Sequence, residues 1–210
     1  MTDLRAPRSN SAMLDAAIVL TAYLVGSIAS AILVCGAMGL PDPRGEGSGN
    51  PGATNVLRIG GKGPAALTLA GDVLKGALPV LLAAGVTRSP TVEALAALAA
   101  FLGHLYPLYF RFRGGKGMAT ALGAIAALAW PVACIMCAIW LAVAATTRYS
   151  SLGSMTAAIG APIAALWFAP DPASVGILGV VAAFLLWRHR GNIRRLIDGT
   201  ESRIGQRTGS

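Results

Sequence analysis

The run GSGNPGATNVLR, from Gly47 to Arg58, is a dense polar segment in a chain that is otherwise mostly apolar. Its residues offer hydrogen-bond donors to an anion. Residues 47–58 contain no carboxylate that would repel an anion, and Glu46 lies just before them. Its glycines can turn main-chain N–H groups inward and carry no side chain to keep a phosphate away. A loop that merely joined two helices would not need so many polar side chains. Those side chains belong to Ser48, Asn50, Thr54, Asn55 and Arg58. We therefore predict that this segment binds phosphate.

A second polar cluster, from His104 to Thr120, places three glycines around Lys116 at the predicted start of a helix. It is not the nucleotide-binding P-loop, because Met118 stands where that motif has a hydroxyl residue and no strand precedes it. The same physics still applies, since a flexible turn presents N–H groups, a helix start adds partial positive charge and lysine adds a full one. A loop that served only as a positively charged anchor at the membrane surface would need Arg111 and Arg113, but it would not need three glycines around one lysine. We predict substrate binding by Gly114, Gly115, Lys116 and Gly117.

A third cluster runs from Trp187 to Gly205 and is rich in arginine. Taken alone, it could be a basic tail that binds anionic lipid. However, His189 and Asn192 are three residues apart at the exit of the last apolar segment, and they should meet the first cluster at the same membrane surface. Convergence of polar groups with a titratable histidine marks a candidate active site.

The composition indicates a membrane protein. Of the 210 residues, 55% are hydrophobic and 12% are charged, and the mean hydropathy of +0.64 is too high for a soluble domain of this size. The net charge of +8 could suggest a nucleic-acid partner, but no basic soluble face or aromatic-rich sheet is visible to bind one. Cys35, Cys134 and Cys137 lie in apolar stretches without metal-ligand spacing, so we expect small buried side chains and no disulfide.

Seven apolar segments follow one another, separated by polar residues, proline or glycine. They cover residues 14–40, 64–86, 91–110, 118–130, 132–147, 152–168 and 173–187. We expect an all-α integral membrane protein with about seven short transmembrane helices. Residues 1–210 would form a single domain with polar tails at 1–12 and 206–210. A kink at Pro131 and a re-entrant unit around Asp171 and Pro172 would instead give five spans.

The positive charges orient the chain, because under either count they fall on one side, which the positive-inside rule makes cytoplasmic. They are Arg44, Arg58, Lys62, Arg111, Arg113, Lys116 and the arginines from Arg188 onward. Most acidic residues of the outer segments fall on the opposite side. The N-terminus should therefore lie outside and the C-terminus in the cytoplasm. Arg148 distinguishes the two counts, since it lies inside with seven spans and outside with five.

Two charged residues interrupt the second apolar segment. Asp72 and Lys75 are three apart, so they lie on one face of the predicted helix and can neutralise each other there. The simpler interpretation is a structural ion pair, and the alternative is that one of them lines a substrate cavity.

Together these motifs resemble the bacterial acyl-phosphate:glycerol-3-phosphate acyltransferase family, small multi-spanning inner-membrane enzymes that begin phospholipid synthesis. The resemblance covers most of the chain and rests on GSIA from Gly26, DPRGEGSGNPGATNVLR from Asp42, GDVLKG from Gly71, GHLYPLYFRFRGGKGMAT from Gly103 and RHRGNIRRLIDGTESRIG from Arg188. It implies seven helices and an active site on the cytoplasmic side of the bacterial inner membrane. It also implies transfer of a fatty acyl group from acyl phosphate to the 1-hydroxyl of sn-glycerol 3-phosphate, giving lysophosphatidic acid and inorganic phosphate.

The resemblance also implies roles for individual residues. Acyl phosphate would be bound by Ser48, Gly49, Ala53, Thr54 and Asn55, with His189 and Asn192 facing it. The glycerol phosphate would be held by Asn50, Arg58 and Lys116. The expected catalytic residues are His189, Asn192 and Ser48.

This chemistry needs no covalent nucleophile. Acyl phosphate is an activated mixed anhydride, so the protein has mainly to position two anions and stabilise developing charge. The sequence has no G-x-S-x-G elbow, and no carboxylate accompanies His189 to form a recognisable triad. We expect direct attack of the glycerol hydroxyl on the acyl carbon, with its proton passing to His189 or, preferably, to the departing phosphate. No metal or other cofactor is expected, so activity should survive chelators.

A membrane transporter of an anionic phosphorylated metabolite is the alternative function, because short helices, glycine-rich breaks and basic loops occur in transporters as well. The polar clusters lie on one face and no internal repeat is obvious, which favours the enzyme. The expected partners are the two substrates and membrane lipid. No nucleic acid is expected, and the sequence identifies no protein partner.

Overall fold

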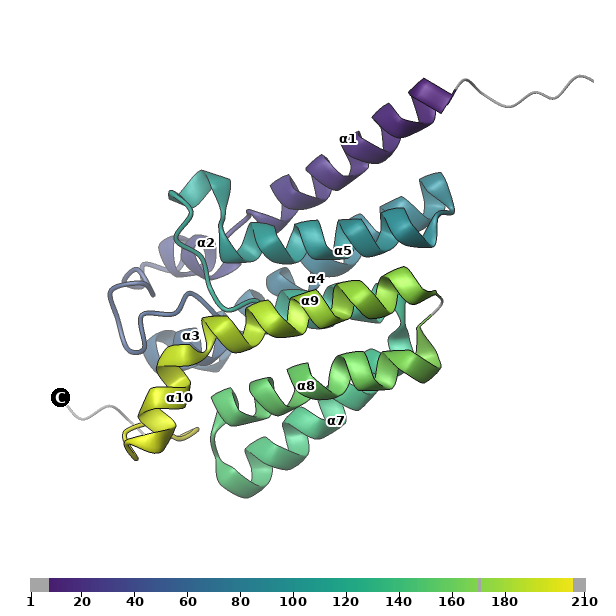
Figure 1. The fold of residues 1–210 in the computed structure, drawn as a ribbon. Helices are drawn as coiled ribbons and strands as arrows, with labels where there is room; N and C mark the ends of the chain where they lie inside the picture. Colours follow the sequence, from purple (N-terminus) through teal and green to yellow (C-terminus); the bar gives the residue numbers. More distant parts are fainter. Residues whose placement is uncertain (1–7, 170, 206–210) are drawn as a thin grey trace, which may run out of the picture.

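The computed structural model describes residues 8–169 and 171–205, and the regular structure in those ranges is helical throughout (Figure 1). The elements are α1 (Arg8–Gly26), α2 (Ser30–Ala37), α3 (Ala53–Gly60), α4 (Lys62–Thr87), α5 (Pro90–Leu105), the 3-10 helix η1 (Leu108–Phe110), α6 (Met118–Leu128), α7 (Trp130–Thr147), α8 (Ser150–Phe168), α9 (Pro172–Arg188) and α10 (Arg190–Ile197). The all-α prediction is confirmed. Of the predicted tails, residues 1–7 and 206–210 lie outside the described ranges, and residues 8–12 belong to α1.

Within the described ranges, four helices are long and apolar enough to cross a membrane: α4, α5 continued through η1, α7 and α8. Two bent pairs pass the same test as broken spans, α1 with α2 at 40° and α9 with α10 at 52°. The number of long spans is therefore four, or up to six if each pair is one span. The shorter apolar helix α6 coincides with the remaining predicted segment.

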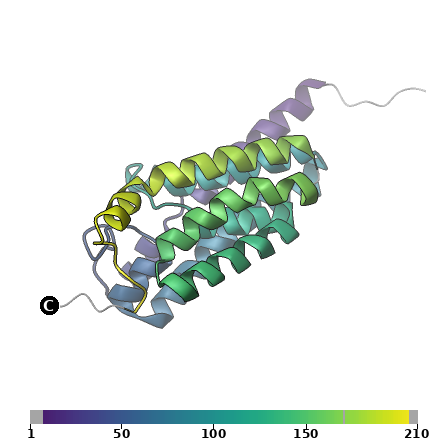
Figure 2. The ribbon, with the colours of Figure 1, turned by 60° about the horizontal axis from the view of Figure 1, so that its bottom comes forward.

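The polar loops gather at one end of the helix bundle, which we call the polar end (Figures 1 and 2). The short helices α2, α3 and α10 lie there. The segment after α10 reaches the connection between α7 and α8 at the same end. The Ile204 N–H donates to the Arg148 carbonyl at 2.7 Å, and Arg148 Nη2 donates to the Ile204 carbonyl at 2.8 Å. Stretches that are remote in sequence are thus brought to one end of the protein.

Small residues let the helices approach closely. A Cβ at Gly76 in α4 would collide with the Thr120 carbonyl of α6, and one at Gly123 in α6 would collide with the Val73 carbonyl of α4. Lipid provides no hydrophobic driving force between helices, so close backbone contacts of this kind stabilise membrane bundles. The α4–α6 pair forms the middle of the fold and carries the glycine-rich turn at the start of α6.

Asp72 and Lys75 form the predicted ion pair, with Lys75 Nζ 2.8 Å from Asp72 Oδ1. Lys75 also donates to the Ile28 carbonyl at 2.6 Å, in the break between α1 and α2. On the other side, His104 Nδ1 lies 3.6 Å from Asp72 Oδ1 and 3.1 Å from Thr120 Oγ1. This buried group of polar side chains joins the α1–α2 break to α4, α5 and α6, so the pair has a structural role. Asp72 also lines the cavity described below, so the two interpretations do not exclude each other.

The prediction that all three cysteines are buried is wrong. Cys35 is buried, but Cys134 is exposed and Cys137 is intermediate. Both lie on α7, at the edge of the bundle (Figure 2). Cys134 faces outward, where lipid surrounds side chains in a membrane, whereas Cys137 lines the cavity described below. Lipid is as apolar as a protein core, so hydropathy alone does not distinguish the two environments.

Candidate functional site

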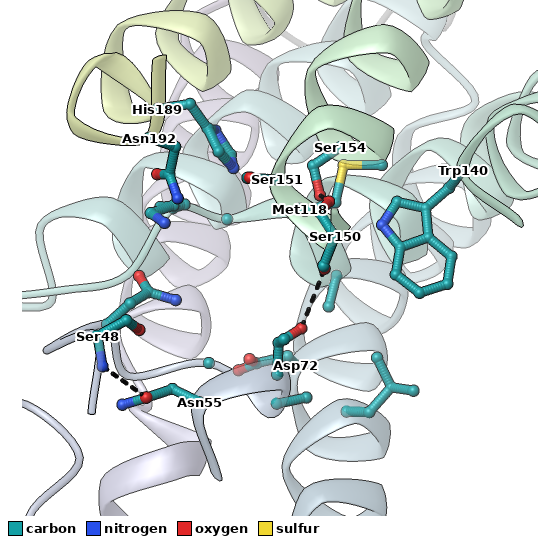
Figure 3. Close-up of a pocket in the computed structure, with 18 of the residues that line it drawn as sticks. Ser48, Asn55, Asp72, Met118, Trp140, Ser150, Ser151, Ser154, His189 and Asn192 are labelled. Carbon is teal, nitrogen blue, oxygen red and sulfur yellow. Dashed lines mark hydrogen bonds between the residues drawn. The ribbon is translucent and has the colours of Figure 1, made fainter. Parts of the chain in front are cut away.

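A cavity of about 600 Å³ opens at the polar end between α3, α4, α6, α7, α8 and α10 (Figure 3). Much of its polar lining comes from three stretches that are far apart in sequence: residues 47–58, the second half of the glycine turn (residues 114–117) and the chain from His189 onward. In Figure 3, His189 and Asn192 point into the cavity, with Ser48 and Asn55 on one side and the serines of α8 on another. The three predicted clusters therefore share one cavity.

Most of the predicted site residues line this cavity. They are Ser48, Asn50, Ala53, Thr54, Asn55, Arg58, Lys116, Gly117, His189 and Asn192. The structure does not place Gly49, Gly114 and Gly115 in its lining. Gly49 and Gly114 instead line a second cavity of about 770 Å³. In a tight loop, successive residues face different directions, so these glycines shape the backbone of the two loops without facing the first cavity.

Asn55 organises the first loop instead of presenting a free amide to the cavity. Its Oδ1 accepts a hydrogen bond from the Ser48 N–H at 2.9 Å, and its Nδ2 donates to the carbonyls of Pro43 and Glu46, both at 2.9 Å. The side chain is 1% exposed. Asn55 therefore holds Ser48 in place at the start of α3.

Three cationic side chains among the described residues reach the cavity: Arg58 from α3, Lys116 from the glycine turn and Arg195 from α10. Burial lowers the pKa of Lys116 to about 8; Glu201 opposes this shift, and the charges of Arg195, Arg58 and Arg188 add to it. Burial also lowers the pKa of Arg58. Partly desolvated cations interact strongly with an anion, because little solvent screens their charge.

The glycines around Lys116 are explained by close packing. A Cβ at Gly115 would collide with the imidazole of His104, and one at Gly117 would collide with the ring of Phe101. Gly117 also has a φ of 86°, in the left-handed region. The Gly115 N–H donates to the His104 carbonyl at 3.3 Å, so it is not free to bind a ligand. The turn thus presents Lys116 from a backbone that fits tightly against α5.

His189 lies at the junction of α9 and α10 and is 3% exposed. Its Nδ1 is 2.8 Å from the Leu185 carbonyl. Because a carbonyl can only accept, Nδ1 must carry the hydrogen, which leaves Nε2 available to a ligand. The Asn192 N–H donates to the His189 carbonyl at 2.8 Å, so both side chains stay on the cavity face despite the bend.

The sequence reasoning missed Glu201, which lines the same cavity. Its Oε1 accepts hydrogen bonds from Ser151 Oγ at 2.6 Å and Asn192 Nδ2 at 2.7 Å, and its Oε2 accepts from Arg195 Nε at 2.7 Å. Burial alone would raise the pKa of Glu201, but these hydrogen bonds lower it below its ordinary value. Glu201 thereby positions Asn192. The sequence does contain a signal that could have indicated this residue, because Glu201 is the one glutamate among the arginines of residues 187–205.

The start of α8 was also missed. Ser150, Ser151 and Ser154 line the cavity, and Ser150 Oγ lies 3.3 Å from Thr54 Oγ1, a contact marked in Figure 3. The first N–H groups of a helix lack intrahelical partners and carry partial positive charge, and no side chain caps them in α8. Three serines close together at a predicted helix start could have indicated this anion-favouring feature.

The rest of the lining is mixed. Asp72 and His104 lie in the wall, whereas the apolar part is formed by Leu69, Met118, Leu122, Met136, Trp140 and Leu141. Such a cavity fits a ligand that has an anionic group at one end and an apolar chain at the other. Among residues 8–169 and 171–205, no group of three His, Cys, Asp or Glu side chains is placed to share a metal ion.

Proteins of one family resemble this chain. The family model described as glycerol-3-phosphate acyltransferase matches residues 16–199. A glycerol-3-phosphate acyltransferase of Halorhodospira halophila is 57% identical over 195 residues, which are 92% of this chain and 98% of that protein. One of Thioalkalivibrio sulfidiphilus is 53% identical over 196 residues, which are 93% of this chain and 97% of that protein.

Two crystal structures of PlsY (YgiH), an integral membrane glycerol 3-phosphate acyltransferase, have the same fold. The glycerol 3-phosphate form matches with a TM-score of 0.86 and 39% identity, covering 91% of this chain and 96% of that chain. The lysophosphatidic acid form matches with a TM-score of 0.84 and 38% identity over the same shares.

Proposed function

Because this chain belongs to the glycerol-3-phosphate acyltransferase family and is an acyltransferase of the integral membrane type, we propose that it uses acyl phosphate as the donor. The acyl group would pass to the 1-hydroxyl of sn-glycerol 3-phosphate, and the products would be lysophosphatidic acid and inorganic phosphate. The observation that supports this is the single cavity in which Arg58, Lys116 and His189 meet an apolar wall. The two phosphates would occupy the cationic part, and the acyl chain would lie along the apolar part.

The substrate assignments follow the sequence prediction. Ser48, Gly49, Ala53, Thr54 and Asn55 would form the acyl-phosphate loop, with Asn55 acting through its hold on Ser48. Asn50, Arg58 and Lys116 would bind the glycerol phosphate, and the glycine turn would present Lys116. The serines at the start of α8 add hydroxyl and N–H donors beside Thr54. These donors suit a phosphate that becomes more negative as it leaves.

The reaction would proceed by direct attack of the glycerol hydroxyl oxygen on the acyl carbon. The new C–O ester bond forms as the bond from the acyl carbon to the phosphate oxygen breaks, and the hydroxyl proton moves to the departing phosphate. His189 Nε2 and Asn192 would hydrogen-bond that phosphate, because Nδ1 is already committed to the Leu185 carbonyl. Glu201 would keep Asn192 in the orientation that allows this contact.

The membrane arrangement is part of the proposal. We place the polar end on the cytoplasmic side of a bacterial inner membrane, with the N-terminus outside and the C-terminus inside, because the basic loops gather at this end. The contact between Ile204 and Arg148 supports seven crossings, since the sequence puts Arg148 on the side of the C-terminal arginines only with that count. Residues 1–210 would then form one acyltransferase domain.

The test is to give purified protein acyl phosphate and glycerol 3-phosphate and to measure lysophosphatidic acid by mass spectrometry together with phosphate release. We expect equal amounts of both products, with or without a chelator. His189→Ala should lower kcat by about 100-fold or more, whereas Ile193→Ala, an exposed position on α10 outside the cavity lining, should leave it unchanged. Uptake of glycerol 3-phosphate into vesicles without any acylated product would identify a transporter and refute the proposal.

A further inference from the structure

Arg188, the last residue of α9, reaches across to the glycine turn. Its Nη2 donates to the Gly114 carbonyl at 2.8 Å and to the Gly115 carbonyl at 2.9 Å, and its Nε donates to the Gly115 carbonyl at 3.0 Å. A planar guanidinium suits two neighbouring carbonyls, because its N–H groups form a rigid fork. The two elements are more than 70 residues apart in sequence, so this is a tertiary contact and not a local one.

The turn is held from its other side by α5. The Gly115 N–H donates to the His104 carbonyl at 3.3 Å. A Cβ at Gly114 would collide with the carbonyls of His104 and Leu105. The backbone of the turn is therefore enclosed between the end of α5 and the Arg188 guanidinium, which occupies the carbonyls of Gly114 and Gly115.

Arg188 has no place in the lining of the main cavity, whereas Lys116, one residue beyond the second clamped carbonyl, does line it. The guanidinium is partly buried and lies 5.8 Å from the centre of the Tyr106 ring and 6.0 Å from that of Trp187. Among the described residues no carboxylate forms a salt bridge with it. Within the described part of the chain, the Arg188 side chain donates hydrogen bonds to the turn alone.

We propose that Arg188 is a positioning residue for the phosphate site, which it serves by fixing the glycine turn so that Lys116 projects into the cavity. This inference rests on the proposed function, because it assigns the phosphate near Lys116 to glycerol 3-phosphate. It separates Arg188 from the other arginines of the C-terminal segment, which the sequence could equally assign to a basic tail on lipid.

The test uses the full-length chain and compares Michaelis constants for the two substrates. Arg188→Ala should raise KM for glycerol 3-phosphate by about tenfold, while KM for acyl phosphate and kcat stay within about twofold. Arg188→Lys should lie between the wild type and Arg188→Ala, since an ammonium group is a point charge without the fork. Guanidinium or methylguanidinium ion added to Arg188→Ala should lower KM again, because it can refill the space between the two carbonyls. A purely structural role would not give this rescue.

Arg190→Ala is the matched control. Arg190 also stacks on Trp187, with its guanidinium carbon 4.6 Å from the ring centre, and it donates to the Trp187 carbonyl at 3.2 Å. It is exposed, and its guanidinium contacts Trp187 and not the turn, so its removal should leave both Michaelis constants at the wild-type value.

The outcomes separate the two proposals. A wild-type protein that makes no lysophosphatidic acid from these substrates refutes the proposed function whatever the variants do. If the wild type is active, an unchanged KM for glycerol 3-phosphate in Arg188→Ala refutes only the positioning role. An equal loss for both substrates without rescue by guanidinium also refutes it. Should Arg188→Ala fail to fold, the same KM comparison is made with Arg188→Gln, whose amide group keeps two N–H donors but has neither the charge nor the reach of the guanidinium.

Discussion

If Lys116 binds glycerol 3-phosphate as proposed, its lowered pKa should make this binding dependent on pH in a range where an ordinary lysine stays charged. Burial brings this pKa to about 8, so about nine-tenths of the amines are charged at pH 7 and about one-tenth at pH 9. Because the pKa is lowered, the charge is lost early as the pH rises, and affinity for an anion falls with it. If only the charged form binds productively, kcat/KM for glycerol 3-phosphate falls about tenfold between pH 7 and pH 9.

The assay is the initial rate of lysophosphatidic acid formation at low glycerol 3-phosphate and saturating acyl phosphate, measured at half-unit steps of pH. The substrate does not produce the fall, because the second pKa of a phosphate monoester is about 6 and the group is a dianion throughout this range. Lys116→Arg is the control, since a guanidinium keeps its charge at every pH tested. Its profile should be flat between pH 7 and pH 9, although its absolute rate is lower.

Two results would show that this reasoning is wrong. A wild-type kcat/KM that stays constant up to pH 9 would mean that the charge of Lys116 is not used in binding. A fall of equal size in Lys116→Arg would assign the titration to another group.

Two further predictions concern residues that hold the site together. Glu201→Gln replaces a carboxylate that accepts three hydrogen bonds, so it should lower the free energy of unfolding by about 2 kcal/mol and reduce kcat. Thermal unfolding in detergent measures the first effect, and steady-state kinetics measure the second. An unfolding midpoint equal to that of the wild type would contradict the assigned contacts. Asn55→Ala removes the acceptor for the Ser48 N–H and the donor to two loop carbonyls. It should therefore raise KM for acyl phosphate by about tenfold or more. Unchanged steady-state kinetics would show that the loop keeps its conformation without this amide.

Much of the fold could be predicted because the long helices are apolar stretches bounded by polar residues, proline or glycine, whereas the short polar helices α3 and α10 do not stand out in this way. The pair formed by Asp72 and Lys75 could also be anticipated, since a spacing of three residues puts both on one helix face. What the spacing could not reveal is the addition of His104 and Thr120, because tertiary packing and not local sequence brings α5 and α6 to that face.

The functional site was likewise predictable only in part from the sequence. Residues with an unusual polar composition, such as those around Ser48 and Lys116, stand out in an apolar sequence, and they do line the cavity. The sequence did not reveal which atoms each of these residues contacts. Asn55 uses its amide within the loop, and Gly115 uses its N–H on His104, so neither acts as a bare donor to a ligand. Glu201 was missed because a carboxylate is unexpected in an anion site, and its hydrogen-bond partners come from two helices, α8 and α10, that only the fold brings together.

Because Glu201 holds Asn192 in the cavity, the order in which the ribosome makes these residues has a consequence for the newly synthesised protein. At about 5–20 residues per second, the ribosome needs about 8–30 s to add the roughly 150 residues that separate it from Ser48. During that interval the first loop is already made, but Asn192 and its carboxylate anchor do not yet exist. On the proposed function, a nascent chain that still lacks Asn192 and Glu201 has an incomplete site and should not turn over its acyl donor.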